Sequence, residues 1–319
     1  MFTVSRLRRK PRLFQMFTGL SVCEFDALLL ELAPLYEAAL SAARSRPDRK
    51  RAPGAGRRFS LALPERVLLC LVYLRLYVSQ SVVSFLFGLD QSNVCREING
   101  RLLPVLLTVL PVPLRDAPLR SESDKATPPG KQRRISSMDE LLRLHPEITD
   151  VLVDATEQSI PQPQNKGRRK RAYSGKKHDH TIKTQIVATK DLILHVFGGL
   201  PGCLHDQMLL GASGVLHQVP TGVTVRMDKG YAGSDTRYKD VEIALPVKKR
   251  RGFQVTWLGR AYNHLLSVLR MPVEHHFARL QTFGVLAGEY RGPEDRHEDV
   301  FCVVSGLLNF RKTGRFALA

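Results

Sequence analysis

Acidic residues are scarce in this chain of 319 residues. It has 30 Asp plus Glu against 48 Lys plus Arg, so its formal net charge is +18, and its isoelectric point is about 10.0. Hydrophobic residues still make up 43% of the sequence, which excludes a wholly disordered basic tail and is enough for a sizeable core. A folded chain this basic favours a polyanionic partner, most often a nucleic acid.

Long apolar runs and paired cysteines are also lacking. The best apolar stretch, 67–74, is broken by Arg75 and is far shorter than the roughly 18 residues that a membrane helix needs. The basic N-terminus is not followed by an apolar region and a cleavage site, so we expect no secretory signal. Five cysteines without a Cys-x-x-Cys pair predict reduced core thiols in a cytoplasmic protein, neither a disulfide framework nor a zinc site. They are Cys23, Cys70, Cys95, Cys203 and Cys302.

Two segments rich in proline, glycine and charge divide the chain. Residues 44–58 are strongly basic, which fits a flexible linker or a phosphate-contacting arm, although a solvated loop is equally compatible. A second proline-rich segment lies at 116–137 and has the composition of a linker. The predicted units are an N-terminal helix and basic linker (1–58), a helical domain (59–115), the linker (116–137) and a larger domain (138–319).

The N-terminal part is predicted to be helical. Ser21 and Glu24 form a capping box ahead of leucines at helical spacing, with a kink expected at Pro34. Further helices are expected at 65–77, 82–87 and 91–102, with a glycine turn at 88–90.

A short helix, a turn and a polar-faced helix are the outline of a helix-turn-helix. Four side chains at the start of the last helix are of types that bond base edges or phosphates, which predicts DNA contact there. They are Gln91, Ser92, Asn93 and Arg96. An ordinary three-helix bundle is the alternative.

The larger domain alternates strands and helices. Strands are expected at 148–155, 181–189, 192–197, 223–227 and 241–247. Helices are expected at 138–144, 205–211, 258–286 with an interruption at Pro272, and 297–309. This order indicates an α/β fold with a mixed sheet.

Three carboxylates of this domain are placed where they can converge. Asp154 and Asp228 each follow an apolar strand, and Glu274 lies in a helical region. Any one strand-end aspartate is more often a turn former, so the prediction depends on the set. Converging carboxylates attract divalent cations, and two Mg²⁺ ions about 3.5–4 Å apart serve both ends of a phosphodiester displacement. The basic run 166–177, which directly follows the first strand, predicts a surface for the nucleic-acid backbone.

Five ordered motifs make the chain resemble the DDE-superfamily transposases of bacterial insertion sequences, of the "IS five" type with an N-terminal helix-turn-helix. The motifs are Val153-Asp-Ala-Thr-Glu157, Tyr173 to Lys183, Pro201-Gly-Cys-Leu-His-Asp206, Asp228-Lys-Gly-Tyr231 and Arg270-x-x-x-Glu274. The similarity covers about residues 60 to 312.

The resemblance implies an RNase H-like catalytic domain after the helix-turn-helix domain. It implies that Asp154, Asp228 and Glu274 are the catalytic residues and bind two Mg²⁺ ions, with Mn²⁺ as a substitute. It also implies DNA contacts at a set of basic residues, namely Lys176, Lys177, Lys183, Lys229, Arg270 and Arg279.

The function implied is binding of the element's ends, then metal-dependent DNA strand cleavage and transfer. The partners would be double-stranded DNA, as terminal inverted repeats and target, and further copies of the chain on that DNA, in a nucleoid-associated protein. Ser267 and Gln281 depart from the family pattern, which has Tyr and a basic residue there, and Pro272 is expected to leave Glu274 in the first turn of a restarted helix. The alternatives are a catalytically inactive or host-recruited DNA-binding protein and a nuclease that cuts without joining.

Other motif residues have structural explanations. His205 and Asp206 are expected to cap and pack a helix start. Gly230 is expected to permit a tight turn. His275 and His276 lack the spacing of a zinc protease.

Overall fold

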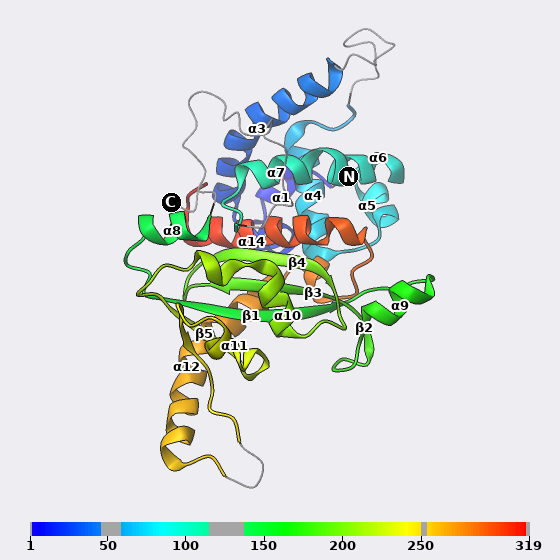
Figure 1. The fold of residues 1–319 in the computed structure, drawn as a ribbon. Helices are drawn as coiled ribbons and strands as arrows, with labels where there is room; N and C mark the ends of the chain where they lie inside the picture. Colours follow the sequence, from blue (N-terminus) through cyan, green and yellow to red (C-terminus); the bar gives the residue numbers. More distant parts are fainter. Residues whose placement is uncertain (1, 46–58, 115–136, 250–253, 317–319) are drawn as a thin grey trace.

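The structure, a computed structural model, describes residues 2–45, 59–114, 137–249 and 254–316. The predicted basic segment 44–58 and linker 116–137 lie almost wholly outside these residues. A helical region and a sheet domain lie on either side of a long C-terminal helix (Figure 1). Within the described residues, no single helix is long and apolar enough to cross a membrane. The pair Pro11–Thr18 and Val22–Arg44, bent by 55°, has the length and composition of a membrane span only when the two helices are taken together.

Three helices begin the chain: α1 (Val4–Arg8), α2 (Pro11–Thr18) and α3 (Val22–Arg44). Only the third was predicted. Its capping box is confirmed, since the Glu24 amide donates to Ser21 Oγ at 3.2 Å and the Ser21 amide donates to Glu24 Oε2 at 2.6 Å. The helix continues through Pro34, and its buried face is formed by Phe25, Leu28, Leu32 and Tyr36.

The helix-turn-helix follows as α4 (Leu63–Leu76), α5 (Gln80–Phe87) and α6 (Gln91–Glu97). Gly88 ends α5 with a φ of +64°, a left-handed conformation that glycine adopts without strain, and this produces the predicted turn. A π-helical stretch, η1 (Ile98–Leu102), connects α6 to α7 (Leu103–Val109).

A buried ion pair ties these helices together. Arg66 of α4 donates through Nε and Nη2 to the two carboxylate oxygens of Glu97 at 2.9 and 2.7 Å. Tyr36 of α3 and Arg101 of η1 donate to the same carboxylate at 2.9 and 2.8 Å. Because every oxygen of this buried carboxylate has a donor, the charge is compensated inside the helical core.

The sheet domain contains six strands: β1 (Asp150–Ser159), β2 (Tyr173–Ser174), β3 (Asp179–Ala188), β4 (Ile193–Pro201), β5 (Thr224–Met227) and β6 (Glu242–Ala244). The main order is β4-β3-β1-β5-β6, and β2 pairs with the start of β3. Strand β3 is antiparallel to β1 and β4, whereas β5 is parallel to β1 and β6 is parallel to β5. This strand order and these directions are those of the RNase H-like fold, so the predicted fold class is confirmed.

The helices of this domain are α8 (Met138–Leu144), α9 (Lys166–Ala172), α10 (Asp206–Ser213), α11 (Ser234–Arg237), α12 (Trp257–Leu280), α13 (Gly284–Ala287) and α14 (His297–Thr313). The short helices η3 (Val215–Gln218), η4 (Lys229–Tyr231) and η5 (Glu294–Arg296) join them. The interruption expected at Pro272 is wrong, because α12 runs through it. The buried residues Val273, His276 and Leu280 anchor the part of α12 beyond the proline. The basic run 166–177 begins with the helix α9.

One hydrophobic core extends from the N-terminal helices to α14 and one face of the sheet. Asn309 of α14 joins the two regions, since its side-chain amide donates to the carbonyls of Pro111 at 3.1 Å and Ile193 at 2.9 Å. A second cluster lies among α8, α10 and β5. The predicted domain boundaries stay predictions, but the helical region is packed on the sheet domain. Cys70 and Cys302 are buried as expected of core thiols, whereas the expectation is wrong for the exposed Cys23 and Cys203.

Candidate active site

Asp154 and Asp228 lie side by side on adjacent parallel strands. The pairing of β1 with β5 ends at Val153 opposite Met227, so the two aspartates are the next residues of their strands in register. The prediction that Asp154 lies at the end of its strand is wrong, because β1 continues to Ser159 along β3. What places it beside Asp228 is the end of the parallel pairing, at an edge where α/β folds commonly bind ligands.

Arg270 of α12 bridges the two carboxylates. Its Nη2 donates to Asp154 Oδ2 at 3.1 Å and its Nη1 donates to Asp228 Oδ1 at 3.2 Å. The Asp228 side chain is 51% exposed, so solvent and a large substrate can reach the pair. The arginine predicted to contact DNA is therefore the counter-charge of the two aspartates in this structure.

A third aspartate lies near this pair. Asp206, the first residue of α10, accepts from Lys183 Nζ at 3.0 Å, and the same ammonium lies 3.3 Å from Glu157 Oε1. His205 occupies the expected N-cap position of α10, but its side chain makes no capping hydrogen bond. Lys183 is buried within β3, which places its ammonium inside the domain instead of on a DNA-facing surface.

Gly230 makes room for Asp206. A Cβ on Gly230 would lie 2.7 Å from Asp206 Oδ2, closer than such atoms approach. Gly230 lies in the expected tight turn, η4, where the Tyr231 amide donates to the Asp228 carbonyl at 3.0 Å, but its φ is not positive, so the turn conformation does not itself require glycine. Its absent side chain leaves space for a carboxylate.

The site is electrostatically crowded. Burial raises the pKa of Asp154, and the charges of Asp228 and Asp206 raise it further, against the lowering effects of the Ala155 amide and Arg270. The pKa of the Tyr231 hydroxyl is raised well above its usual value, first by burial and then by the charges of Asp154 and Asp206. The carboxylates are therefore close enough to repel one another, and a cation relieves that repulsion.

Glu274 lies on α12 one turn beyond Arg270, and its side chain is exposed. It is well inside the helix, so its expected position in a first turn is wrong. Within the described parts of the chain, no group of three or more His, Cys, Asp or Glu is placed to hold a metal ion. The structure thus brings Asp154 and Asp228 together and does not bring Glu274 into the same cluster.

Most of the residues predicted to contact DNA are on the surface. Gln91, Ser92 and Asn93 are exposed at the start of α6, and Arg96 donates to the Ser92 and Asn93 side chains at 3.1 Å each. Exposed basic residues also follow β2 and β5, namely Lys176, Lys177 and Lys229. Arg279 is exposed near the C-terminal end of α12. These DNA contacts stay predictions.

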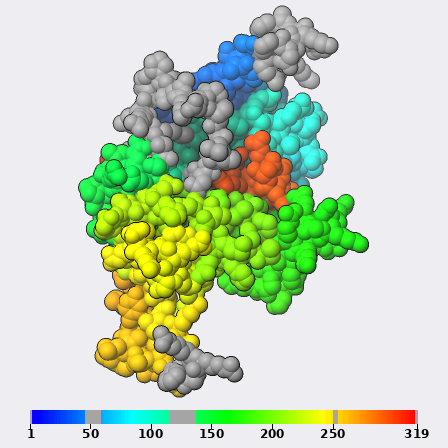
Figure 2. Space-filling model, viewed as in Figure 1, coloured from blue at the N-terminus to red at the C-terminus, as the bar shows by residue number. Residues whose placement is uncertain are grey.

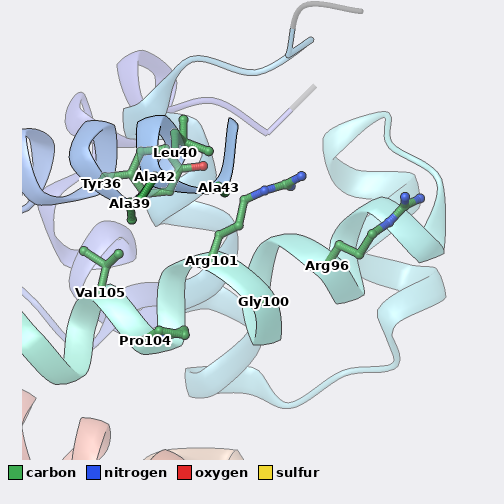
Figure 3. Close-up of a pocket in the computed structure, with 10 residues that line it drawn as sticks. All are labelled: Tyr36, Ala39, Leu40, Ala42, Ala43, Arg96, Gly100, Arg101, Pro104 and Val105. Carbon is green, nitrogen blue, oxygen red and sulfur yellow. The ribbon is translucent and has the colours of Figure 1, made fainter. Parts of the chain in front are cut away.

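A hollow of about 570 Å³ lies beside α6 and η1. Tyr36 and Leu40 of α3 and Pro104 and Val105 of α7 form its apolar lining (Figure 3). Arg96 of α6 and Arg101 of η1 also line it, and their side chains point in the same direction (Figure 3).

Known proteins resemble the chain in both regions. The profile of the DDE superfamily endonucleases matches residues 153–309, and that of their helix-turn-helix matches residues 59–108. A "Probable transposase for insertion sequence element IS702" from Microchaete diplosiphon is 31% identical over 264 residues, which is 82% of this chain and 86% of that protein. The chain belongs to the DDE superfamily.

A solved structure was also matched to this DDE-superfamily protein. The "Crystal structure of the Mos1 Strand Transfer Complex" aligns with all of this chain and 99% of its own, with 10% identity and a TM-score of 0.21. That score is too low to support an argument, so the fold assignment depends on the strand order.

His297 and Arg291 of the DDE-superfamily protein make contacts with residues far away in the sequence. The buried His297 shares a hydrogen bond of 2.8 Å between its Nε2 and Gln158 Oε1. Arg291 donates to the Tyr77 carbonyl and lies over the Tyr77 ring. Their partners are more than 100 residues away in the chain, so spacing alone carried no signal for these contacts.

Proposed function

We propose that the protein is a transposase whose sheet domain cleaves and joins DNA strands at Asp154 and Asp228. The observation that carries this proposal is the register of β1 and β5, which puts the two carboxylates next to each other. Membership of the DDE superfamily, 31% identity to a probable transposase and the match to a helix-turn-helix profile support the same function.

The residues of the site fit a divalent cation. Two adjacent carboxylates supply the hard oxygen ligands that Mg²⁺ prefers. The guanidinium of Arg270 already lies between them, so the site is shaped for positive charge. Asp154 and Asp228 would hold the metal, with Glu274, on the same face of α12 as Arg270, completing the set. Bound Mg²⁺, or Mn²⁺ in its place, would lower the pKa of a water and stabilise charge on the phosphoryl oxygens.

The proposed reaction has two displacements at phosphorus. A water oxygen forms a bond to phosphorus as the bond to the 3′-oxygen breaks, which leaves a 3′-hydroxyl. That hydroxyl then attacks a phosphodiester of the target DNA and releases a new 3′-hydroxyl. Asp154 and Asp228 orient the groups at the reacting phosphate, and Asp228 is the more accessible of the two.

The helix-turn-helix would recognise the ends of the element. Exposed Gln91, Ser92 and Asn93 at the start of α6 are placed to reach base edges. The basic helix α9 and the neighbouring Lys176 and Lys177 would hold the backbone of the DNA.

Strand cleavage by aspartate variants tests the proposal. The substrate is a duplex containing the DNA that flanks the gene, incubated with Mg²⁺ or Mn²⁺. Asp154→Asn and Asp228→Asn should lose cleavage and strand transfer while they bind the duplex like the wild type. Asp240→Asn, an exposed aspartate of the same domain, is the matched control and should cleave normally. Normal cleavage by both site variants contradicts the proposal.

A second function, DNA binding without cleavage, is favoured by the position of Glu274 outside the cluster. It predicts a wild-type protein that binds the duplex tightly and does not cleave it with either metal. A nuclease that cuts without joining would release 3′-hydroxyl ends and form no joined product. The same assay therefore separates all three functions.

A further inference from the structure

The first half of α12 stands away from the body of the protein. Residues 257–269 form an arm about 20 Å long that projects from the sheet domain (Figures 1 and 2). The helix α12 contacts β1, β5 and α14, and most of its buried residues, Val273, His276 and Leu280, lie in its second half.

An apolar stripe runs along the arm. Leu258, Tyr262, Leu265 and Leu269 are spaced by four, three and four residues and are 71%, 40%, 56% and 40% exposed. Their spacing puts them on one face, the seam of a coiled coil. The stripe continues into Val273, His276 and Leu280, which are buried in the body. The same face of α12 is thus core in one half and open in the other.

The positions beside this stripe carry no charge. In a helix pair these flanking positions are Gly259, Ala261, Leu266 and Val268. Charged or titratable side chains of the arm, such as Arg260 and His264, lie on other faces. The whole chain has a net charge of +18, but these uncharged flanking positions add no local repulsion between two copies along the stripe.

The arm is held in shape by its own preceding segment. The Val247 amide donates to Asn263 Oδ1 at 2.7 Å, and Asn263 Nδ2 donates to the Val247 carbonyl at 3.0 Å. Asn263 lies about 100° or more around the helix from the stripe, so this contact leaves the stripe open. A rigid apolar face loses less entropy on association than a flexible one does.

We propose that the arm binds the arm of a second copy of this chain, with the two helices antiparallel. Antiparallel pairing puts Leu258 opposite the partner's Leu269 and Tyr262 opposite the partner's Leu265, a self-complementary contact with two-fold symmetry. In a parallel pair, the partner's helix would continue alongside the second half of α12. That half is covered by β1, β5 and α14, so the partner's helix would collide with them. This proposal goes beyond the transposase function and does not depend on metal, DNA or catalysis.

Sedimentation of the full-length protein without DNA tests the dimer. Leu265→Glu places two charges in the seam of a symmetric dimer, and we expect the dissociation constant to rise about 100-fold, tenfold for each copy. His264→Glu, the adjacent exposed residue off the stripe, is the matched control and should dimerise like the wild type.

Disulfide crosslinking tests the direction of the helices and does not require a destabilising charge. In a background with the exposed Cys23 and Cys203 replaced by serine, Tyr262→Cys combined with Leu265→Cys should give a covalent dimer on oxidation. Leu258→Cys alone should not, because two copies of residue 258 meet only in a parallel pair. A wild type that stays monomeric at all concentrations overturns the proposal, as does a Leu265→Glu variant that dimerises normally. Weaker DNA binding by Leu265→Glu with unchanged sedimentation would also overturn it, since the stripe would then face DNA.

Discussion

At the scale of single residues, the two aspartates could be predicted and their neighbours could not. Asp154 and Asp228 follow apolar runs, and parallel strands bring such positions together. Asp206, Lys183 and Glu157 meet only through the folding of β1, β3 and α10. The motif that ends in Asp206 was recognised in the sequence. Because a carboxylate at a helix start is usually a cap, its position near the two aspartates was not predicted.

Gly230 provides a test of the space around Asp206. Gly230→Ala puts a methyl group 2.7 Å from Asp206 Oδ2, so the carboxylate must move. We expect DNA cleavage to slow on the order of 100-fold, because a displacement of about 1 Å near reacting groups has that effect. Gly175→Ala, where the added Cβ meets nothing within 4 Å, is the control. Equal cleavage rates for the two variants would show that Asp206 does not influence the site.

His297 makes the stability of the protein depend on pH. Burial lowers its pKa from 6.5 to about 4. Below pH 6.5, His297 therefore binds a proton in the unfolded chain but not in the folded protein. The stability that the neutral, buried His297 contributes is lost as the pH falls from 6.5 towards 4. The loss should be on the order of 3 kcal/mol.

Urea unfolding across this pH range measures the effect of His297. His297→Gln should flatten the decline in unfolding free energy, whereas replacement of the exposed His264 by Gln should leave it unchanged. The same decline in the His297→Gln variant would assign the pH dependence to other groups.

At the scale of elements, helix ends were easier to predict than helix interruptions. The cap at Ser21 and the glycine turn at Gly88 are local, so the sequence contained their full cause. Pro272 was expected to break α12 because an interior proline costs about 3 kcal/mol. Burial of Val273, His276 and Leu280 against the body offsets that cost, and this packing is tertiary information.

The Glu97 carboxylate holds four elements of the helical region together. Glu97→Ala leaves the buried guanidinium of Arg66 without its partner and should lower the unfolding free energy by about 3–5 kcal/mol. Glu37→Ala, on the exposed face of α3, should change it little. Denaturant unfolding of both variants at neutral pH measures the difference. A loss below about 1 kcal/mol for Glu97→Ala would mean that the network contributes no more than an exposed pair.

At the scale of the whole molecule, the sequence predicted separate units and the structure shows a shared core. The core cluster includes residues from α1 to α14, and Asn309 connects α14 to Pro111, which follows α7. Composition reveals linkers because prolines and charges are local, but it contains no information on how two apolar surfaces meet. The N-terminal helix α2 was missed for the same reason, since its main packing partner, α4, is distant in sequence.

The basic surface should make DNA binding depend on salt. Replacing both Lys176 and Lys177 by Ala should weaken binding of every duplex about equally and lower the slope of log affinity against log salt by about 2. Asn93→Ala should instead weaken binding to the preferred duplex while leaving that slope unchanged. A binding titration at several salt concentrations distinguishes these effects. An unchanged slope in the double lysine variant would remove these residues from the DNA-binding surface.

The central claim is that Asp154 and Asp228 form one site for a divalent cation, and Mn²⁺ binding measured by water-proton relaxation tests it most directly. Asp154→Asn and Asp228→Asn should each weaken Mn²⁺ binding about tenfold or more, because each removes a charged oxygen ligand, and Asp240→Asn should bind like the wild type. Equal Mn²⁺ affinity in all four proteins would contradict the account.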